Sequence, residues 1–151
     1  MGYSIQCVGQ NWLRARDSDL RLLMRMMVVQ MADLRASFPH LQAFAESWDM
    51  QALYPTPGCI RLELDSIACD RLMVSDFIRL IRMIRCEIMK YGPVLDASTI
   101  NRRWPVRGGE WGDEDACKLI SLLDAIEALV TGKPLVETCE SKQWWASGSR
   151  D

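Results

Sequence analysis

Histidine is nearly absent from this sequence of 151 residues, in which His40 is the single example. One histidine excludes the zinc motifs that need a histidine pair, such as H-E-x-x-H and the two-cysteine, two-histidine finger. The glycine motifs that bind phosphate groups and the G-x-S-x-G nucleophile elbow are also missing. We therefore predict that the protein is not an enzyme and that it holds no metal and no cofactor.

Paired cysteines are lacking as well, because the six cysteines are scattered and include no C-x-x-C motif. The first residues do not combine a basic segment with a following apolar one, as a secretory signal does. No apolar run reaches the roughly 18 residues of a membrane span. These absences predict a cytoplasmic protein with no membrane association, whose thiols are free and buried as small hydrophobic side chains.

The composition is that of an ordinary globular domain, with 49% hydrophobic and 25% charged residues. A net charge of −2 and a pI of about 5.5 disfavour a protein whose whole surface holds nucleic acid. The charge is uneven, because residues 59–109 carry nine basic and six acidic side chains, whereas residues 110–151 carry four basic and nine acidic ones. The two segments could complement each other or present faces of opposite sign to a partner.

Apolar side chains recur at helical spacing in four stretches of the chain. The clearest helix is predicted at about residues 69–90, where Gly92 and Pro93 provide the stop signal. An earlier helix, from about residue 20 to residue 34, is apolar nearly all round, which is typical of a buried central helix. A third helix is predicted after Pro39, and the last one runs from Asp113, as its N-cap, to Thr131.

Residues 59–65, CIRLELD, alternate apolar and charged side chains and form the one strand-like pattern in the chain. A lone strand has no pairing partner, so this segment is either the lead into the next helix or an edge that pairs across a homodimer. The predicted fold class is therefore predominantly all-α, a compact bundle of four to five helices with at most this one short strand. Residues 1–140 form a single helical domain in this prediction, and residues 141–151 a polar, partly disordered tail.

The predicted helix at residues 70–90 also carries a basic stripe on its polar side, formed by Arg71, Arg79, Arg82 and Lys90. Two interpretations are open. The stripe is either a solvated outer face, paired in part with the acidic last helix, or a track for phosphates or for an acidic partner.

Residues 101–111, NRRWPVRGGEW, concentrate arginine and tryptophan in a stretch that cannot form one regular element. In one interpretation this segment is a plug, whose tryptophans cap an open end of the helical core and whose arginines pair with Glu110, Asp113 and Glu114. In the other it is the centre of an interaction surface, because Arg and Trp dominate binding hot spots. The residues predicted for that surface are Arg102, Arg103, Trp104, Arg107 and Trp111, with Arg79 and Arg82 nearby. Trp144 and Trp145 are two further aromatic residues outside the helical stripes.

A small, mildly acidic helical protein without catalytic motifs is expected to work by binding. We predict a stoichiometric inhibitor or adaptor of a protein partner, of the immunity or anti-defence type; the likeness is one of type, and no motif carries it. The alternative is a nucleic-acid-associated accessory subunit that uses the basic helix 70–90 and the Arg/Trp segment 101–111.

Overall fold

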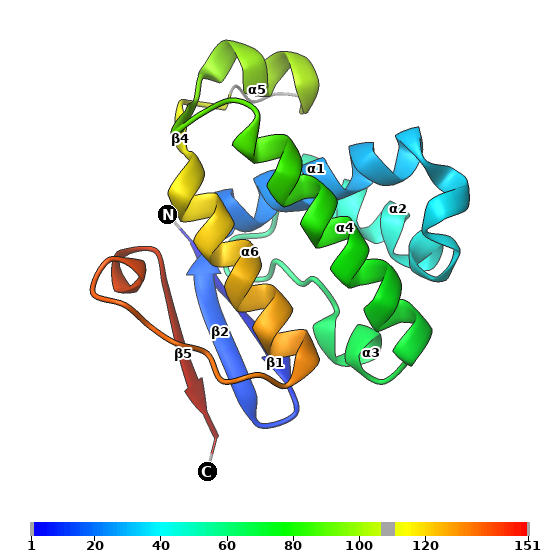
Figure 1. Ribbon diagram of the computed structural model, residues 1–151, viewed down its shortest axis with the longest axis vertical. Coiled ribbons are helices and arrows are strands. Elements are labelled where there is room, and N and C mark those ends of the chain that lie inside the picture. Colours follow the sequence, from blue (N-terminus) through cyan, green and yellow to red (C-terminus); the bar gives the residue numbers. More distant parts are fainter. Residues whose placement is uncertain (1, 107–110, 151) are drawn as a thin grey trace.

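A computed structural model describes residues 2–106 and 111–150 of the chain. Its described residues form a mixed α/β fold, in which a three-stranded antiparallel sheet lies beside a group of helices (Figure 1). The elements are β1 (Tyr3–Val8), β2 (Asn11–Arg16), α1 (Asp17–Asp33), η1 (Arg35–Ser37), η2 (Pro39–Leu41), α2 (Gln42–Leu53), α3 (Leu64–Ala68), α4 (Arg71–Met89), β3 (Val94–Leu95), α5 (Ala97–Arg103), β4 (Glu114–Asp115), α6 (Ala116–Thr131), η3 (Ser141–Gln143) and β5 (Trp145–Ser149).

The three-stranded sheet shows that the predicted all-α bundle is wrong. Its strand order is β1-β2-β5, so the N-terminal hairpin and the C-terminal strand form one sheet. Gly9, at φ 57°, supplies the left-handed residue that the two-residue turn between β1 and β2 needs. β1 was not recognisable because its pattern is inverted: Ser4 and Gln6 are buried, whereas Tyr3 and Ile5 are 41% and 50% exposed.

The buried polar side chains of β1 hydrogen-bond the chain that passes beside it. Gln6 donates from Nε2 to the Ile60 carbonyl (2.7 Å) and accepts at Oε1 from the Leu62 amide (2.8 Å). The Ile60 amide donates to Ser4 Oγ (2.8 Å). These side-chain bonds take the place of a strand ladder.

Residues 59–63 are therefore not a strand, although their alternation is real. Ile60 and Leu62 are buried, and Arg61 and Glu63 are exposed. The segment leads directly into α3, which was one of the two interpretations of its sequence.

The three longest helices, α1, α4 and α6, pack together beside the sheet around one core. α1 packs against α2 and α4, and α6 lies between α4 and β2. In Figure 1, α6 runs alongside β2, with its axis nearly parallel to that strand, and α5 lies at the far end of α4. α1 is buried on several sides, as its apolar pattern predicts; its buried apolar residues are Leu20, Leu22, Leu23, Met24, Met26, Met27 and Met31.

Aspartates begin three of the helices. Asp70, Asp96 and Asp115 each accept hydrogen bonds from backbone amides in the first turn of α4, α5 and α6. The N-cap of α6 is thus Asp115, two residues after the predicted Asp113, whose carboxylate instead accepts from the Ala97 amide. Gly132, at φ 71°, ends α6 in the left-handed conformation.

The last segment of the chain is anchored through β5, which pairs along β2 from Trp145 to Ser149. Residues 145–149, which the sequence assigns to a polar tail, belong to this strand. The Glu137 carboxylate accepts hydrogen bonds from the amide and the hydroxyl of Ser147 at 2.7 and 2.9 Å. These two bonds hold the preceding loop against β5.

Replacing Gln6 by leucine tests whether the side-chain bonds organise the fold. Gln6→Leu leaves the Ile60 carbonyl and the Leu62 amide buried without partners, so we expect the free energy of unfolding to fall by about 2–4 kcal/mol. Gln51→Leu is the matched control, because Gln51 makes the same pair of bonds to Arg61 at an exposed site. In a denaturant titration, the control should lose less than about 1 kcal/mol of its free energy of unfolding. Equal losses in the two variants would contradict the role of Gln6.

Candidate functional site

Both tryptophans of the Arg/Trp segment lie in the core. Trp104 is 3% exposed and Trp111 is 8% exposed. The Trp111 indole Nε1 donates to the Trp104 carbonyl (3.0 Å), and the Trp104 ring meets Tyr91 edge-on at 6.1 Å. Asn101 clamps Trp111 by exchanging hydrogen bonds with its backbone amide and carbonyl, both at 2.8 Å. This is the arrangement that the plug interpretation expects.

The arginines of the same segment have different surroundings. Arg102 is exposed at the end of α5. Arg103 approaches Asp33 and Glu87, each at 3.6 Å, and pairs with neither Asp113 nor Glu114, two of the carboxylates that the plug interpretation expects; the third, Glu110, lies outside the described residues. Arg107 lies outside the described residues.

Arg79 and Arg82 each contact other parts of the protein. Arg79 donates to Asp76 (2.7 Å) and to the Ser37 carbonyl, and its guanidinium lies over the Phe38 ring at 5.3 Å. Arg82 pairs with Glu127 of α6 at 3.2 Å. These contacts connect Arg79 to η1 and Arg82 to α6, and neither arginine forms a hydrogen bond or ion pair with the described part of the Arg/Trp segment.

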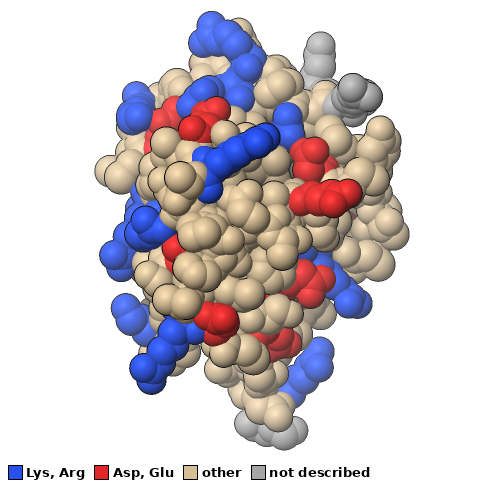
Figure 2. Space-filling model, turned by 90° about the vertical axis from the view of Figure 1, so that its right-hand side faces the viewer, with Lys and Arg blue, Asp and Glu red and all other residues tan. Residues whose placement is uncertain are grey.

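The basic stripe of α4 is exposed along its whole length and partly neutralised. Beside Arg82, Arg85 pairs with both Asp124 and Glu127 of α6, and Lys90 pairs with Glu87 at 2.7 Å. Positive and negative side chains are intermixed on the face of the molecule in Figure 2. This pairing of α4 with the acidic last helix is the arrangement that the solvated-face interpretation of the stripe expects.

His40 lies at the surface beside α4. Its ring Nδ1 is 3.0 Å from Asp76 Oδ2, and its backbone amide donates to the same oxygen. Burial raises the pKa of the Asp76 carboxyl, but the hydrogen bonds from Arg79 and His40 outweigh burial, so this pKa is below its ordinary value. Asp76 thus acts as a buried anion that joins η2 to α4.

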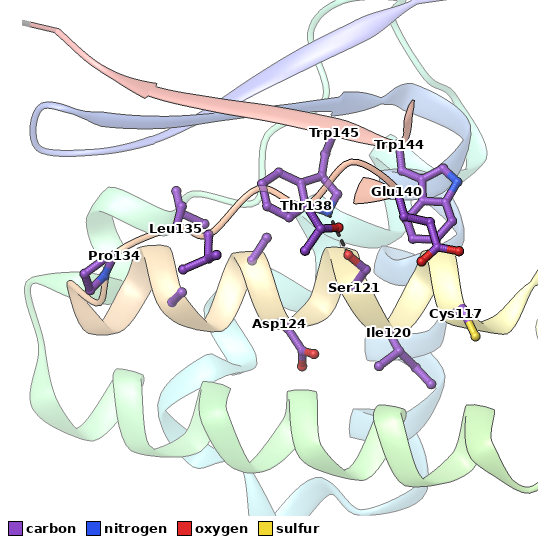
Figure 3. A pocket seen from close by; sticks show the side chains of 13 residues that line it. Cys117, Ile120, Ser121, Asp124, Pro134, Leu135, Thr138, Glu140, Trp144 and Trp145 are labelled. Atoms are coloured by element: carbon purple, nitrogen blue, oxygen red, sulfur yellow. Dashed lines mark hydrogen bonds between the residues drawn. The ribbon is translucent and has the colours of Figure 1, made fainter. Parts of the chain in front are cut away.

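A groove lies between α6 and the loop that follows it. It encloses about 490 Å³, with α6 as its floor and residues 134–140 as its outer wall. Figure 3 shows Trp145 and Ser121 turned toward each other across the gap, with Leu135 and Pro134 near one end and Trp144 at the other. Its lining residues are Cys117, Ile120, Ser121, Asp124, Ala125, Ala128, Pro134, Leu135, Val136, Thr138, Glu140, Trp144 and Trp145.

Local hydrogen bonds hold both walls of the groove. The Trp145 indole Nε1 donates to Ser121 Oγ (3.0 Å), which anchors the start of β5 to α6. Thr138 and Ser141 exchange bonds between their amides and hydroxyls at 2.7 and 3.0 Å, which closes the turn at the outer wall. Trp144 is half-buried, and Val136 is 75% exposed at the rim. A groove with fixed walls and exposed apolar side chains can receive an apolar group.

The groove residues were not predicted from the sequence. The one signal was the Trp144-Trp145 pair, which lies outside every helical stripe. Its meaning depends on the loop 133–144 folding back over α6, which no local pattern indicates.

The prediction of buried thiols is wrong for most of the cysteines. All six are unpaired, but only Cys7 is half-buried, and the exposed ones are Cys59, Cys69, Cys86, Cys117 and Cys139. They lie at helix ends, in loops and on outer helix faces, where apolar packing is not available. Cys117 lines the groove.

Within residues 2–106 and 111–150, no cluster of three or more His, Cys, Asp or Glu side chains could hold a metal ion. No described helix combines the length and apolarity needed to cross a membrane. Comparison with protein-family models, curated proteins and solved structures finds no significant match to this chain.

Trp104→Ala tests the plug arrangement. Removing a buried indole leaves a large cavity, so we expect the free energy of unfolding to fall by about 3–5 kcal/mol in a denaturant titration. Arg102→Ala is the control, because it changes an exposed residue of the same segment. Its free energy of unfolding should stay within about 0.5 kcal/mol of that of the unsubstituted protein. A Trp104→Ala protein as stable as the unsubstituted one would show that the indole is not part of the core.

Asp76→Asn tests the buried anion through its pH dependence. A carboxylate whose pKa is lowered by folding stabilises the protein above its unfolded pKa of about 4, and this stabilisation is lost as the pH falls through the folded pKa. We expect the variant to lose about 2 kcal/mol at neutral pH and to show a weaker decline of stability in acid. Glu46→Gln, at an exposed carboxylate, should leave the acid profile unchanged. Parallel acid profiles for Asp76→Asn and the original protein would contradict this assignment.

Proposed function

We propose that the protein acts by stoichiometric binding to a protein partner, as an inhibitor or adaptor and not as an enzyme. The observation that carries the proposal is the apolar groove between α6 and residues 134–140. A partner side chain inserted there would contact Trp144, Leu135 and Val136, which are large apolar groups on fixed walls. Buried aromatic anchors of this kind supply most of the energy of many protein interfaces.

The charges around the groove favour a partner segment with a basic residue next to an apolar one. Glu140 lines the groove, is exposed and forms no ion pair with any described residue. Asp124, also in the lining, keeps 58% of its side chain exposed although it pairs with Arg85. Opposite charge on the partner would steer association and fix the register of the inserted side chain.

The alternative function, nucleic-acid association through helix 70–90 and the Arg/Trp segment, has less support. Arg79, Arg82, Arg85 and Lys90 are engaged with carboxylates of this chain, and such pairs must be broken before these groups meet phosphates. Both tryptophans of the segment are buried and cannot stack on bases. The exposed free thiols favour a reducing compartment, and we propose the cytoplasm.

Filling the groove tests the proposed function. Ala128 lies half-buried in the lining, and Ala128→Trp would occupy the space with an indole while leaving the core side chains in place. We expect a partner purified with the tagged protein from its host to bind this variant at least about 30-fold more weakly, which corresponds to a hot-spot loss of 2 kcal/mol.

Ala43→Trp, on the exposed surface of α2, is the matched control and should bind as the unsubstituted protein does. Circular dichroism and thermal unfolding establish that both variants are folded. A partner held equally by Ala128→Trp and Ala43→Trp would place the interaction elsewhere on the molecule.

A further inference from the structure

The outer face of the three-stranded sheet presents aromatic and basic side chains to solvent. Alternate residues of β1 and β2 point away from the core: Tyr3 and Ile5 are 41% and 50% exposed, Arg14 is exposed and Trp12 is half-buried. Their inward neighbours Leu13 and Ala15 are fully buried under the helices. α6 packs against the sheet on the side of those buried residues, which leaves the opposite face open (Figure 1).

The indole of Trp12 lies on the backbone of β5. Trp12 pairs with Gly148 across the sheet. A Cβ at position 148 would lie only 2.5–2.8 Å from the indole atoms Cζ2, Cε2 and Nε1, so only glycine leaves room for the ring in this position. One side of the ring therefore rests on the sheet.

A second flat surface stands on the neighbouring strand. The Arg14 guanidinium lies over the Tyr3 ring, with its Cζ atom 4.6 Å from the ring centroid. A guanidinium fixed over an aromatic ring is a plane on which a nucleobase can stack. Trp12 and Arg14 are alternate residues of β2, so the two surfaces are about 7 Å apart along the strand.

Three exposed cations lie near these two planes. Arg14, Lys142 and Arg150 are exposed, and none forms an ion pair with a carboxylate of the described chain. Arg14 and Lys142 line a depression of 240 Å³ with Tyr3 and Trp144. Arg150 lines another depression with Ile5 and Cys7, and Arg61, Glu63 and Asp65 line it as well. The cations of this face thus differ from Arg79, Arg82, Arg85 and Lys90 of α4, which pair with acidic side chains.

We infer that the outer face of the sheet binds single-stranded nucleic acid. Unpaired bases stack on Trp12 and on the Arg14–Tyr3 pair, and the phosphates meet the charged groups of Arg14, Lys142 and Arg150. Base stacking on aromatic rings together with a positively charged surface is how proteins hold single strands without reading their sequence. A duplex keeps its bases stacked inside and offers none to these planes, and an acidic polypeptide has charge but no bases. This inference goes beyond the proposed protein-binding function and concerns a different surface.

Fluorescence anisotropy with labelled oligothymidine and oligouridine of about 15 nucleotides tests the inference directly. We expect binding at low salt that weakens as salt rises, with a slope of log K against log salt near −2 for three phosphate-contacting cations. Trp12→Ala should weaken binding about tenfold or more, Trp12→Phe should retain most of it, and Gly148→Leu should weaken it by displacing the indole. Arg14→Gln should make the salt slope shallower by about 0.7.

Arg102→Glu on α5 is the matched control for charge, because it removes an exposed arginine from the surface that the sequence had suggested. It should bind as the original protein does, and a duplex of equal length and polyglutamate should bind at least about tenfold more weakly than the single strand. Thermal unfolding verifies that each variant is folded. The inference is overturned if the protein does not bind the oligonucleotides, or if folded Trp12→Ala binds them with unchanged affinity. It is also overturned if Arg102→Glu is the variant that loses binding, or if the duplex or polyglutamate binds as tightly as the single strand.

Discussion

Ser4, Gln6 and Asp17 connect three segments that no backbone ladder joins, and both layers of the fold depend on their hydrogen bonds. Asp17 begins α1 and accepts from Ser4 Oγ (2.5 Å) and from the Gly58 amide (2.8 Å). Ser4 and Gln6 then bond the backbone at Ile60 and Leu62. An unpaired buried backbone group costs about as much as a lost hydrogen bond. The passage of residues 58–62 beside β1 and the start of α1, where the backbone of Ile60 and Leu62 is buried, therefore requires polar side chains at these sites.

The same requirement shapes the outer surface of the sheet. Side chains alternate along a strand, so turning Ser4 and Gln6 inward turns Tyr3, Ile5 and Cys7 outward. Apolar and aromatic side chains thus gather on the solvent face of β1, next to Trp12 and Arg14 of β2. The inward orientation of Ser4 and Gln6 therefore both satisfies the buried backbone groups and creates the exposed aromatic surface of the sheet.

A buried ion cluster holds α6, the floor of the groove, to α1. Lys118 of α6 donates to Asp19 (2.9 Å), at the start of α1, and to Glu114 (2.5 Å). Burial lowers the pKa of Lys118, but the hydrogen bonds to Glu114 and Asp19 outweigh burial and raise it above its ordinary value. The charged form is therefore the stable one at this site. With Trp145 bonded to Ser121, the floor and one wall of the groove are fixed before any partner binds.

The sequence by itself determined the long helices, because their 3.6-residue apolar pattern is a local signal, to which α4 and α6 add an aspartate at the start and a glycine after the end. The exposed basic side of α4 was equally predictable, since its residues follow the same period as its buried side. Only the tertiary structure decided the sheet, because β1 carries an inverted pattern and β2 pairs with β5 from the opposite end of the chain. It also decided that Trp104 and Trp111 are buried, that Arg82 meets Glu127 and that the loop after α6 forms a groove. Each of these depends on contacts between residues far apart in sequence, which local periodicity does not specify.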